Sequence, residues 1–287
     1  MDRCLLQVHA HPDDEASKGA GVAARYTAEG VRCVLVTCTG GEAGDILNEA
    51  MDTPEVRQNL AEVRMQELKE SVAILGYAGL HLLGYRDSGR PETEENAHPD
   101  AFANAPLEEA VGKLVAIIRT ERPQVIITYP EVQTFYPHPD HIRVTEVTLG
   151  AWEAAGDADR YPDAGDPWTS SKLYAAGFTK RRIQAAHDWL ITHDKESPYQ
   201  QWLSPGSERE WRDDLLRTQI DVRAHVLTAR ESLRAHRTQV APDSFWFSVP
   251  DEVAADVYPY EDYHLIRTRV EGTVPDEGFE RDLFAGI

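Results

Sequence analysis

Two short clusters of histidine and aspartate have the residue types of a metal site. One reads His-Pro-Asp-Asp-Glu over residues 11–15, and the other reads Pro-His-Pro-Asp-His over residues 137–141. Zinc takes imidazole nitrogen and carboxylate oxygen as ligands, and a catalytic site keeps one position open for water. Two candidate ligands stand three residues apart in each cluster, so they can face one point. We therefore expect a two-histidine, one-carboxylate site built from His11, Asp14 and His141.

The remaining side chains of both clusters have the chemistry for the acid–base steps of amide hydrolysis. Asp13 is a candidate general base, because a carboxylate can take the proton of an attacking water whose pKa the metal lowers to about 7. A protonated His138, helped by the Tyr136 hydroxyl, could stabilise the developing oxyanion. Either Asp13 or His138 could protonate the leaving amine. Asp140 could hydrogen-bond a histidine and fix its tautomer.

A purely structural interpretation competes with this one. The run over residues 11–14 alone is compatible with a helix-capping turn, because aspartate is a good N-cap. The functional interpretation is favoured because both clusters follow predicted strands of one sheet. The remaining histidines stand apart from these clusters, and we expect no role in the site for His81, His98, His187, His193, His225, His236 and His264.

Strand-like and helix-like segments alternate over the first 180 residues. The predicted strands are residues 4–8, 31–37, 80–83, 125–128 and 173–178, and the predicted helices are residues 18–29, 55–75, 107–121 and 138–155. This alternation is typical of an α/β fold with a mostly parallel sheet and helices on both faces. Ligands of such sheets bind beyond the carboxyl ends of the strands. Polar clusters follow four of the strands, which predicts one cleft.

The alternation weakens after about residue 180, where residues 211–236 have the pattern of one long helix. We expect residues 1–180 to form a metal-dependent catalytic core. Residues 181–287 are expected to form a smaller C-terminal α/β portion that packs on the core and covers the cleft.

Composition and charge narrow the class of partner. The formal net charge of −20 disfavours binding to nucleic acid or to anionic lipid, because both are negatively charged. We therefore expect a small molecule as the partner, and the sequence does not exclude a homo-oligomer. The three cysteines form no Cys-x-x-Cys pair, which argues against a disulfide framework and a thiolate zinc site. No secretory leader and no run of roughly 20 apolar residues is visible, so we expect a cytoplasmic protein.

The two clusters resemble the PIG-L/LmbE-like family of zinc-dependent deacetylases, which has a Rossmann-like fold. Further runs resemble its mycothiol branch and, within it, the amidases of mycothiol S-conjugates. These runs are residues 17–19, 39–48, 87–89, 164–168 and 283–286. The resemblance covers nearly the whole chain and is weakest over residues 180–235.

The resemblance implies roles for individual positions. His11, Asp14 and His141 match the zinc ligands, Asp13 the general base and His138 the histidine that stabilises the tetrahedral intermediate. Two further matches are a nearby tyrosine at Tyr136 and, at Asp140, a residue that tunes His138. Contacts to a glucosaminyl-inositol substrate are implied for Lys18, Arg64 and Asp87. Ferrous iron would suit two histidines and one carboxylate nearly as well as zinc.

The implied reaction is hydrolysis of the amide of a mycothiol S-conjugate to a mercapturic acid and glucosaminyl-inositol, in thiol-dependent detoxification. One departure is the run over residues 130–135, where the amidases usually carry a Gly-rich loop; Pro130 stiffens it. A related enzyme of a specialised biosynthetic pathway therefore stays open. So does the N-acetylglucosaminyl-inositol deacetylase of mycothiol biosynthesis. A non-catalytic sugar-binding protein is disfavoured by Asp13, and a dinucleotide enzyme by the missing Gly-x-Gly-x-x-Gly.

Overall fold

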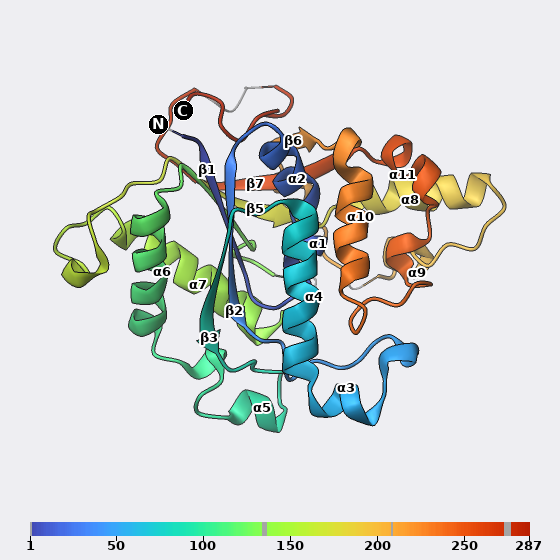
Figure 1. Ribbon diagram of the computed structural model, residues 1–287. Coiled ribbons are helices and arrows are strands. Elements are labelled where there is room, and N and C mark those ends of the chain that lie inside the picture. Colours follow the sequence, from blue (N-terminus) through green and yellow to red (C-terminus); the bar gives the residue numbers. More distant parts are fainter. Residues whose placement is uncertain (1, 134–136, 208, 273–276) are drawn as a thin grey trace.

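The computed structural model describes residues 2–133, 137–207, 209–272 and 277–287. Its centre is a seven-stranded sheet in the order β3-β2-β1-β4-β5-β7-β6, drawn in Figure 1. The strands are β1 (Cys4–His9), β2 (Arg32–Thr39), β3 (Gly79–Tyr85), β4 (Val125–Thr128), β5 (Lys172–Gly177), β6 (Thr218–Asp221) and β7 (Tyr260–Thr268). Neighbours from β3 to β5 are parallel, whereas β7 runs antiparallel to β5 and β6. The predicted mostly parallel α/β fold is confirmed.

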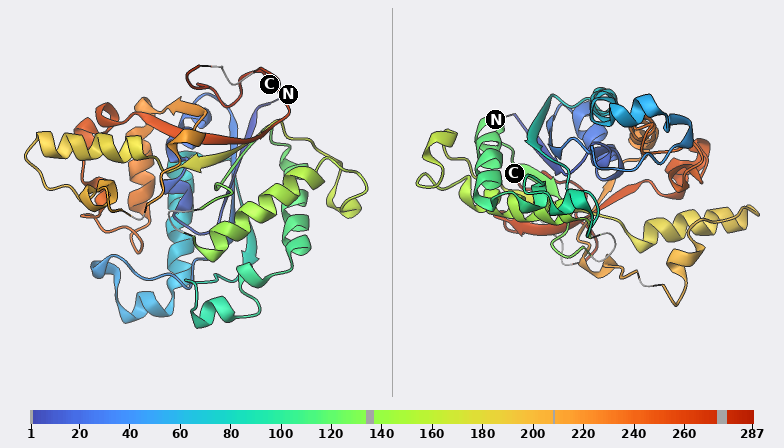
Figure 2. Two further views of the ribbon diagram at one scale, coloured as in Figure 1. Left: turned by 180° about the vertical axis from the view of Figure 1, so that it is seen from behind. Right: turned by 90° about the horizontal axis from the view of Figure 1, so that it is seen from below.

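Helices cover both faces of this sheet, as Figures 1 and 2 show. One face carries α6 (Leu107–Glu121) and α7 (Pro139–Ala154), and the other carries α2 (Ala20–Ala28), α4 (Leu60–Leu75) and α10 (Val226–Ala235). The remaining helices are α1 (Asp14–Ser17), α3 (Pro54–Gln58), α5 (Glu94–Ala97), α8 (Lys180–Thr192), α9 (Gln200–Leu203) and α11 (Asp251–Val257). No helix in these described ranges is both long enough and apolar enough to cross a bilayer.

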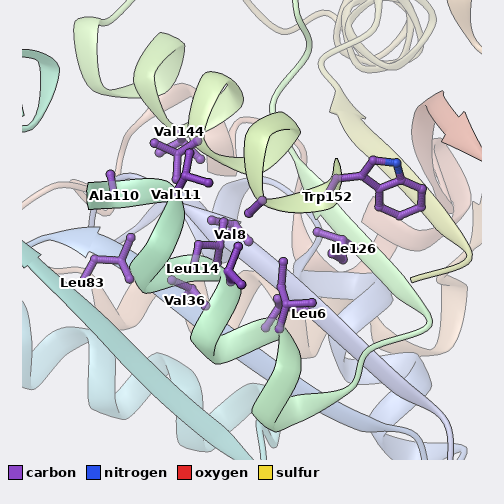
Figure 3. Close-up of a cluster of buried hydrophobic side chains, with 14 of the residues drawn as sticks. Leu6, Val8, Val36, Leu83, Ala110, Val111, Leu114, Ile126, Val144 and Trp152 are labelled. Carbon is purple, nitrogen blue, oxygen red and sulfur yellow. The ribbon is translucent and has the colours of Figure 1, made fainter. Parts of the chain in front are cut away.

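Alternation along β1 divides its side chains between two apolar cores. Leu6 and Val8 pack under α6 and α7 in the core that Figure 3 shows, with Trp152 at its edge. Leu5 points to the opposite face, into the core beneath α2 and α4. The Leu5 face also buries Gln7 and His9, which lie within hydrogen-bond distance of each other at 3.2 Å. Both faces of β1 are therefore buried, and its carboxyl end leads directly to His11 and Asp14.

Local signals set several helix ends that bear on the site. Pro139 occupies the first turn of α7, and the His138 side chain caps it by accepting from the Asp140 backbone N–H at 3.2 Å. Helix α4 ends at Gly76, which adopts φ +77°. The predicted helix over residues 55–75 is broken at Asn59, where α3 ends and α4 begins.

The predicted single helix over residues 211–236 is wrong. Strand β6 occupies part of this range and pairs with β7, and only its last third forms α10. The pairing buries Thr218 and Ile220 completely, and Ile220 joins the core beneath α2. Burial against a neighbouring strand therefore overrides the helical composition of this segment.

Candidate active site

A cavity of about 710 Å³ opens at the carboxyl ends of the parallel strands. Side chains that follow β1, β2, β3, β4 and β5 all line it, as do residues from the C-terminal segment. Representatives of each are His11 and Asp14 after β1, Ala43 after β2, Asp87 after β3, Tyr129, His138 and His141 after β4, Phe178 after β5, and Trp246. The single cleft that the sequence predicts is therefore present.

Asp14 lies between two histidines of the predicted ligand set. Its Oδ2 is 3.4 Å from His11 Nδ1 and 3.5 Å from His141 Nε2. Two ligand atoms of a tetrahedral zinc, each about 2.0–2.2 Å from the ion, lie about 3.3–3.6 Å apart. The spacing and the chemistry of these three donors thus fit a divalent ion, and His11, Asp14 and His141 are all buried.

Two overlapping groups of donors extend this candidate metal site. His11, His138 and His141 each place one nitrogen within 4.8 Å of the others, and so do the donors of His11, Asp87, His138 and Asp140. Asp14 belongs to neither group, although its contacts to His11 and His141 are shorter than 4.8 Å. The distances of 3.4 and 3.5 Å favour Asp14 as a ligand, because a bound ion draws its ligands to within about 3.6 Å of one another.

Asp140 orients His11. Its Oδ2 lies 3.0 Å from His11 Nε2 and accepts the Ser88 backbone N–H at 3.0 Å, while its Oδ1 accepts the Ser88 hydroxyl. An Nε2–H that donates to Asp140 leaves the Nδ1 lone pair directed at Asp14. A carboxylate behind a ligating histidine does this in many metal sites. The carboxylate that we expected to tune His138 thus hydrogen-bonds His11, while its own backbone N–H meets His138.

The charges around the cluster favour a cation. Burial would lower the pKa of His11, but its contacts with Asp14 and Asp140 raise that pKa to about 10. Burial likewise opposes ionisation of Asp14, yet the charges of Lys18 and His141 hold the pKa of Asp14 well below its ordinary value. Asp14 is therefore an anion, and the carboxylates stabilise positive charge where the candidate ligands converge.

Asp13 stands at the rim of the cluster in a strained backbone conformation. Its φ is +111°, which is costly for a residue with a Cβ and which occurs mainly at functional sites. Its Oδ2 accepts from Arg64 Nη2 at 3.1 Å, and its side chain keeps 27% of its surface exposed. Burial raises the pKa of Asp13, and the Arg64 charge opposes that rise. A solvent-accessible carboxylate of raised pKa suits proton transfer.

His138 can act as a neutral hydrogen-bond donor. Its Nδ1 accepts a backbone N–H, so a neutral imidazole must carry its proton on Nε2. Burial, with the charges of His11 and His141, lowers the pKa of His138 to about 3. A proton on Nε2 is therefore available to a group in the cavity, and the role of His138 as a donor to an oxyanion stays a prediction. Tyr136 lies outside the described residues.

The three predicted substrate contacts line the same cavity. Lys18 Nζ lies 2.6 Å from Asp14 Oδ1, which makes it a neighbour of the candidate ligand. Arg64 is only 3% exposed and donates to the backbone oxygens of Pro12 and Gly41, so it is no solvated surface charge. Asp87 is buried and lies 3.7 Å from His11 Nε2 through its Oδ1.

Glycine is required where the loop that follows β2 contacts the Arg64 guanidinium. A Cβ at Gly41 or Gly44 would overlap the Arg64 guanidinium, and Gly41 also adopts φ +69°. The Gly-rich run after β2 therefore lets its backbone close on the arginine that holds Asp13.

Two contributors escaped the sequence analysis. The Tyr129 hydroxyl donates to Asp14 Oδ2 at 2.6 Å, and its ring stacks on His141 with centroids 4.5 Å apart. Its place directly after a predicted strand was the available signal. His236 Nε2 lies 2.6 Å from Glu15 Oε1, and both side chains are fully buried. Glu15 Oε2 in turn accepts the Asp13 backbone N–H at 3.0 Å. No local sequence pattern predicts this contact, because the two residues are 221 positions apart in the sequence.

Sequence comparison finds relatives over the whole chain. The family model described as PIG-L, GlcNAc-PI de-N-acetylase, matches residues 6–152. The chain is 42% identical to the mycothiol S-conjugate amidase of Streptomyces coelicolor, over 99% of this chain and 97% of that protein. It is 38% identical to the 1D-myo-inositol 2-acetamido-2-deoxy-alpha-D-glucopyranoside deacetylase of Geodermatophilus obscurus, over 99% and 98%. The corresponding deacetylase of Rhodococcus jostii is 39% identical, over 100% and 99%.

Solved structures share the fold at low sequence identity. The N,N'-diacetylchitobiose deacetylase of Pyrococcus horikoshii superimposes with a TM-score of 0.63 at 18% identity, over 92% of this chain and 84% of that chain. The 4-carboxy-2-hydroxymuconate hydratase of Pseudomonas putida gives a TM-score of 0.64 at 16% identity, over 95% and 100%. A hydratase among these neighbours means that the fold alone does not select the reaction.

Proposed function

The chain belongs to the PIG-L family of deacetylases and amidases, and we propose that it hydrolyses the amide bond of mycothiol S-conjugates. The products are a mercapturic acid and glucosaminyl-inositol, which is a reaction of thiol-dependent detoxification. The observation that carries the proposal is Asp14 Oδ2 within 3.5 Å of both His11 Nδ1 and His141 Nε2, with Asp13 beside it. The 42% identity to a mycothiol S-conjugate amidase over nearly both full lengths supports the substrate class.

We assign the metal ligands as His11, Asp14 and His141. Imidazole nitrogen and carboxylate oxygen suit zinc, and ferrous iron is the second choice for this donor set. A divalent ion held there would polarise the amide carbonyl and make a water more acidic.

The side chains around the ligands carry the proton and charge transfers. Asp13 takes a proton from water, whose oxygen adds to the amide carbonyl carbon, and Arg64 holds the Asp13 carboxylate in place. His138 donates its Nε2–H to the oxyanion that forms at the carbonyl oxygen. The carbon–nitrogen bond then breaks, and the amine nitrogen takes the proton that Asp13 received from water. An acid and an amine leave the site.

The amino-sugar part of the substrate is assigned to the side of the cavity that lies after β2 and β3. Arg64 and Asp87 line that side, and Lys18 also lines the cavity, with its Nζ 2.6 Å from Asp14 Oδ1. Hydroxyl groups of a sugar and an inositol can donate to carboxylates and accept from cations, which these three residues provide. We propose them as substrate contacts.

A second candidate is the deacetylation of N-acetylglucosaminyl-inositol. It would use the same ligands, base and sugar contacts, and it is favoured by the 38–39% identity to deacetylases of that substrate. The altered run over residues 130–135 bears on the choice, because Pro130, Val132 and Gln133 line the cavity. An amidase of a specialised biosynthetic pathway would differ from a detoxifying one at this loop.

One competition assay separates these candidates. Metal-loaded protein is given a mycothiol S-conjugate and N-acetylglucosaminyl-inositol together, and kcat/KM is measured for release of each amine. Strong preference for the conjugate supports the amidase, and preference for the acetyl sugar assigns the chain to mycothiol biosynthesis. Turnover of neither by protein that retains its metal would show that our substrate assignment is wrong.

A further inference from the structure

The cavity changes character along the order of the strands. Its polar side lies after β2 and β3, where Asp45, Arg64, Asp87 and Arg90 face it. The candidate ligands follow β1 and β4 in the middle of the sheet. Beyond them, after β5, four aromatic rings line the cavity together with charged side chains that include Arg182, Arg212 and Asp213, whereas none of the described Phe or Trp residues lines the side after β2 and β3. A substrate whose scissile amide lies at the ligands therefore extends to both sides, and its two parts meet different chemistry.

The aromatic side is built by residues that are far apart in sequence. Phe178 directly follows β5, Trp202 lies on α9, and Phe245 and Trp246 precede α11. The Phe178 ring centroid is 6.2 Å from that of Trp202, with an interplanar angle of 61°, and 6.2 Å from that of Trp246, with an interplanar angle of 81°. Trp202 and Phe245 are 5.1 Å apart. We call these four residues the aromatic wall.

All four rings of the aromatic wall line the cavity, and none of them is fully buried. When an apolar ligand group covers apolar rings that line a cavity, the removal of both surfaces from water makes binding more favourable. They also offer faces and edges to a flat ring, because aromatic pairs prefer offset or perpendicular contact. The wall therefore has the chemistry of a subsite for an aromatic group.

We propose that the aromatic wall binds an aromatic substituent on the acyl side of the substrate, which in a mycothiol S-conjugate is the group carried by sulfur. The inference rests on the proposed function for the identity of the substrate. It follows from the cavity's order, because a sugar placed at Arg64 and Asp87 leaves only the acyl part to extend past the ligands toward Phe178. An acetyl group ends at one methyl and has no group to extend toward the wall.

The first test compares two conjugates on the metal-loaded enzyme, mycothiol S-benzyl conjugate and mycothiol S-methyl conjugate. We expect kcat/KM to be about 10- to 100-fold higher for the benzyl compound, mainly through a lower KM. Phe178→Leu and Trp202→Leu should each lower that ratio at least about fivefold while the S-methyl rate persists, which also shows that the site is folded.

The matched control is Trp189→Leu. Trp189 packs in the same C-terminal aromatic cluster as Phe178 and Trp202 but does not line the cavity. This variant should keep the benzyl-to-methyl ratio of the native protein. Equal kcat/KM for the two conjugates, or an equal loss for both in the Phe178 and Trp202 variants, overturns the proposal.

A binding measurement separates this proposal from the proposed function. Calorimetric titration compares N-acetyl-S-benzylcysteine with N-acetyl-S-methylcysteine, which need no turnover. Tighter binding of the benzyl compound that Phe178→Leu weakens supports the subsite even if only the acetyl sugar is hydrolysed, an outcome that rejects the amidase alone. Equal binding of the two compounds rejects the subsite, whatever the enzyme hydrolyses.

Discussion

Replacing Asp140 with asparagine should weaken metal binding while leaving the fold intact. In the native protein the Asp140 carboxylate meets His11 Nε2, the Ser88 backbone N–H and the Ser88 hydroxyl. An asparagine has nearly the same shape, and its one amide oxygen can still accept from His11 and from the Ser88 N–H. The substitution therefore removes mainly the negative charge behind the histidine.

The expected magnitude follows from that loss of charge. A carboxylate that accepts from one imidazole nitrogen makes the other nitrogen a stronger ligand, and loss of such a partner typically costs about 10- to 100-fold in metal affinity. This corresponds to about 1.4–2.7 kcal/mol of binding free energy. The effect should lie near the upper end, because Asp140 is fully buried and its charge is poorly screened.

The assay is a competition for zinc between the protein and a chromophoric chelator, with circular dichroism as the measure of folding. Asp100→Asn serves as the matched control, since the Asp100 side chain is 82% exposed and should not affect the ion. An unchanged zinc dissociation constant in Asp140→Asn would refute the reasoning. It would mean that His11 does not bind the metal through Nδ1 while its Nε2–H donates to Asp140.

Three further outcomes are expected. Asp13→Ala should lower kcat by about 10²–10⁴ with unchanged metal content, as measured by steady-state kinetics and metal analysis; normal turnover would remove Asp13 as the base. Lys172→Met should lower the free energy of unfolding in urea by about 3–5 kcal/mol, because it leaves Glu280 buried without its 2.6 Å partner. The double variant with Glu280→Gln should recover much of that loss, and failure to recover would mean that packing dominates. Burial lowers the pKa of His236, but Glu15 raises it above its ordinary value of about 6.5. Its stabilisation is therefore complete below about pH 6.5 and is lost as the pH rises through the raised pKa. His236→Gln should thus be less stable than the native protein at about pH 6 and should approach it in alkaline urea titrations; a pH-independent difference would contradict this sign.

The candidate site was accessible from sequence because its parts obey local rules. His11 and Asp14 follow a buried strand directly, and His138 and His141 stand at a helix start, so the parallel sheet brings both pairs to one edge. In the structure Asp14 Oδ2 lies 3.4 Å from His11 Nδ1 and 3.5 Å from His141 Nε2. The histidines of the two clusters place one nitrogen each within 4.8 Å of one another. The roles of ligand, base and oxyanion donor remain proposals, which the variants above test.

Chain segments that form strands only against a partner were beyond the reach of local patterns. The sequence pattern predicts a helix over residues 211–236, yet residues 218–221 pair with residues 260–263 of β7. The C-terminal residues Leu283 and Phe284 enter the core beneath α2 for the same reason, since their burial depends on the surface that they meet.

The parallel sheet, the position of the cleft and the residue types that line it could thus be predicted from the amino-acid sequence, because each depends on short-range periodicity or on motifs of a few residues. Only the tertiary structure assigned Asp140 to His11, Tyr129 to Asp14 and His236 to Glu15, and only it assembled the aromatic wall. These contacts join side chains more than 100 residues apart, or gather rings from several loops. Which residues come into contact here depends on how distant segments pack in three dimensions. Such contacts have no fixed sequence spacing, so local patterns do not predict them.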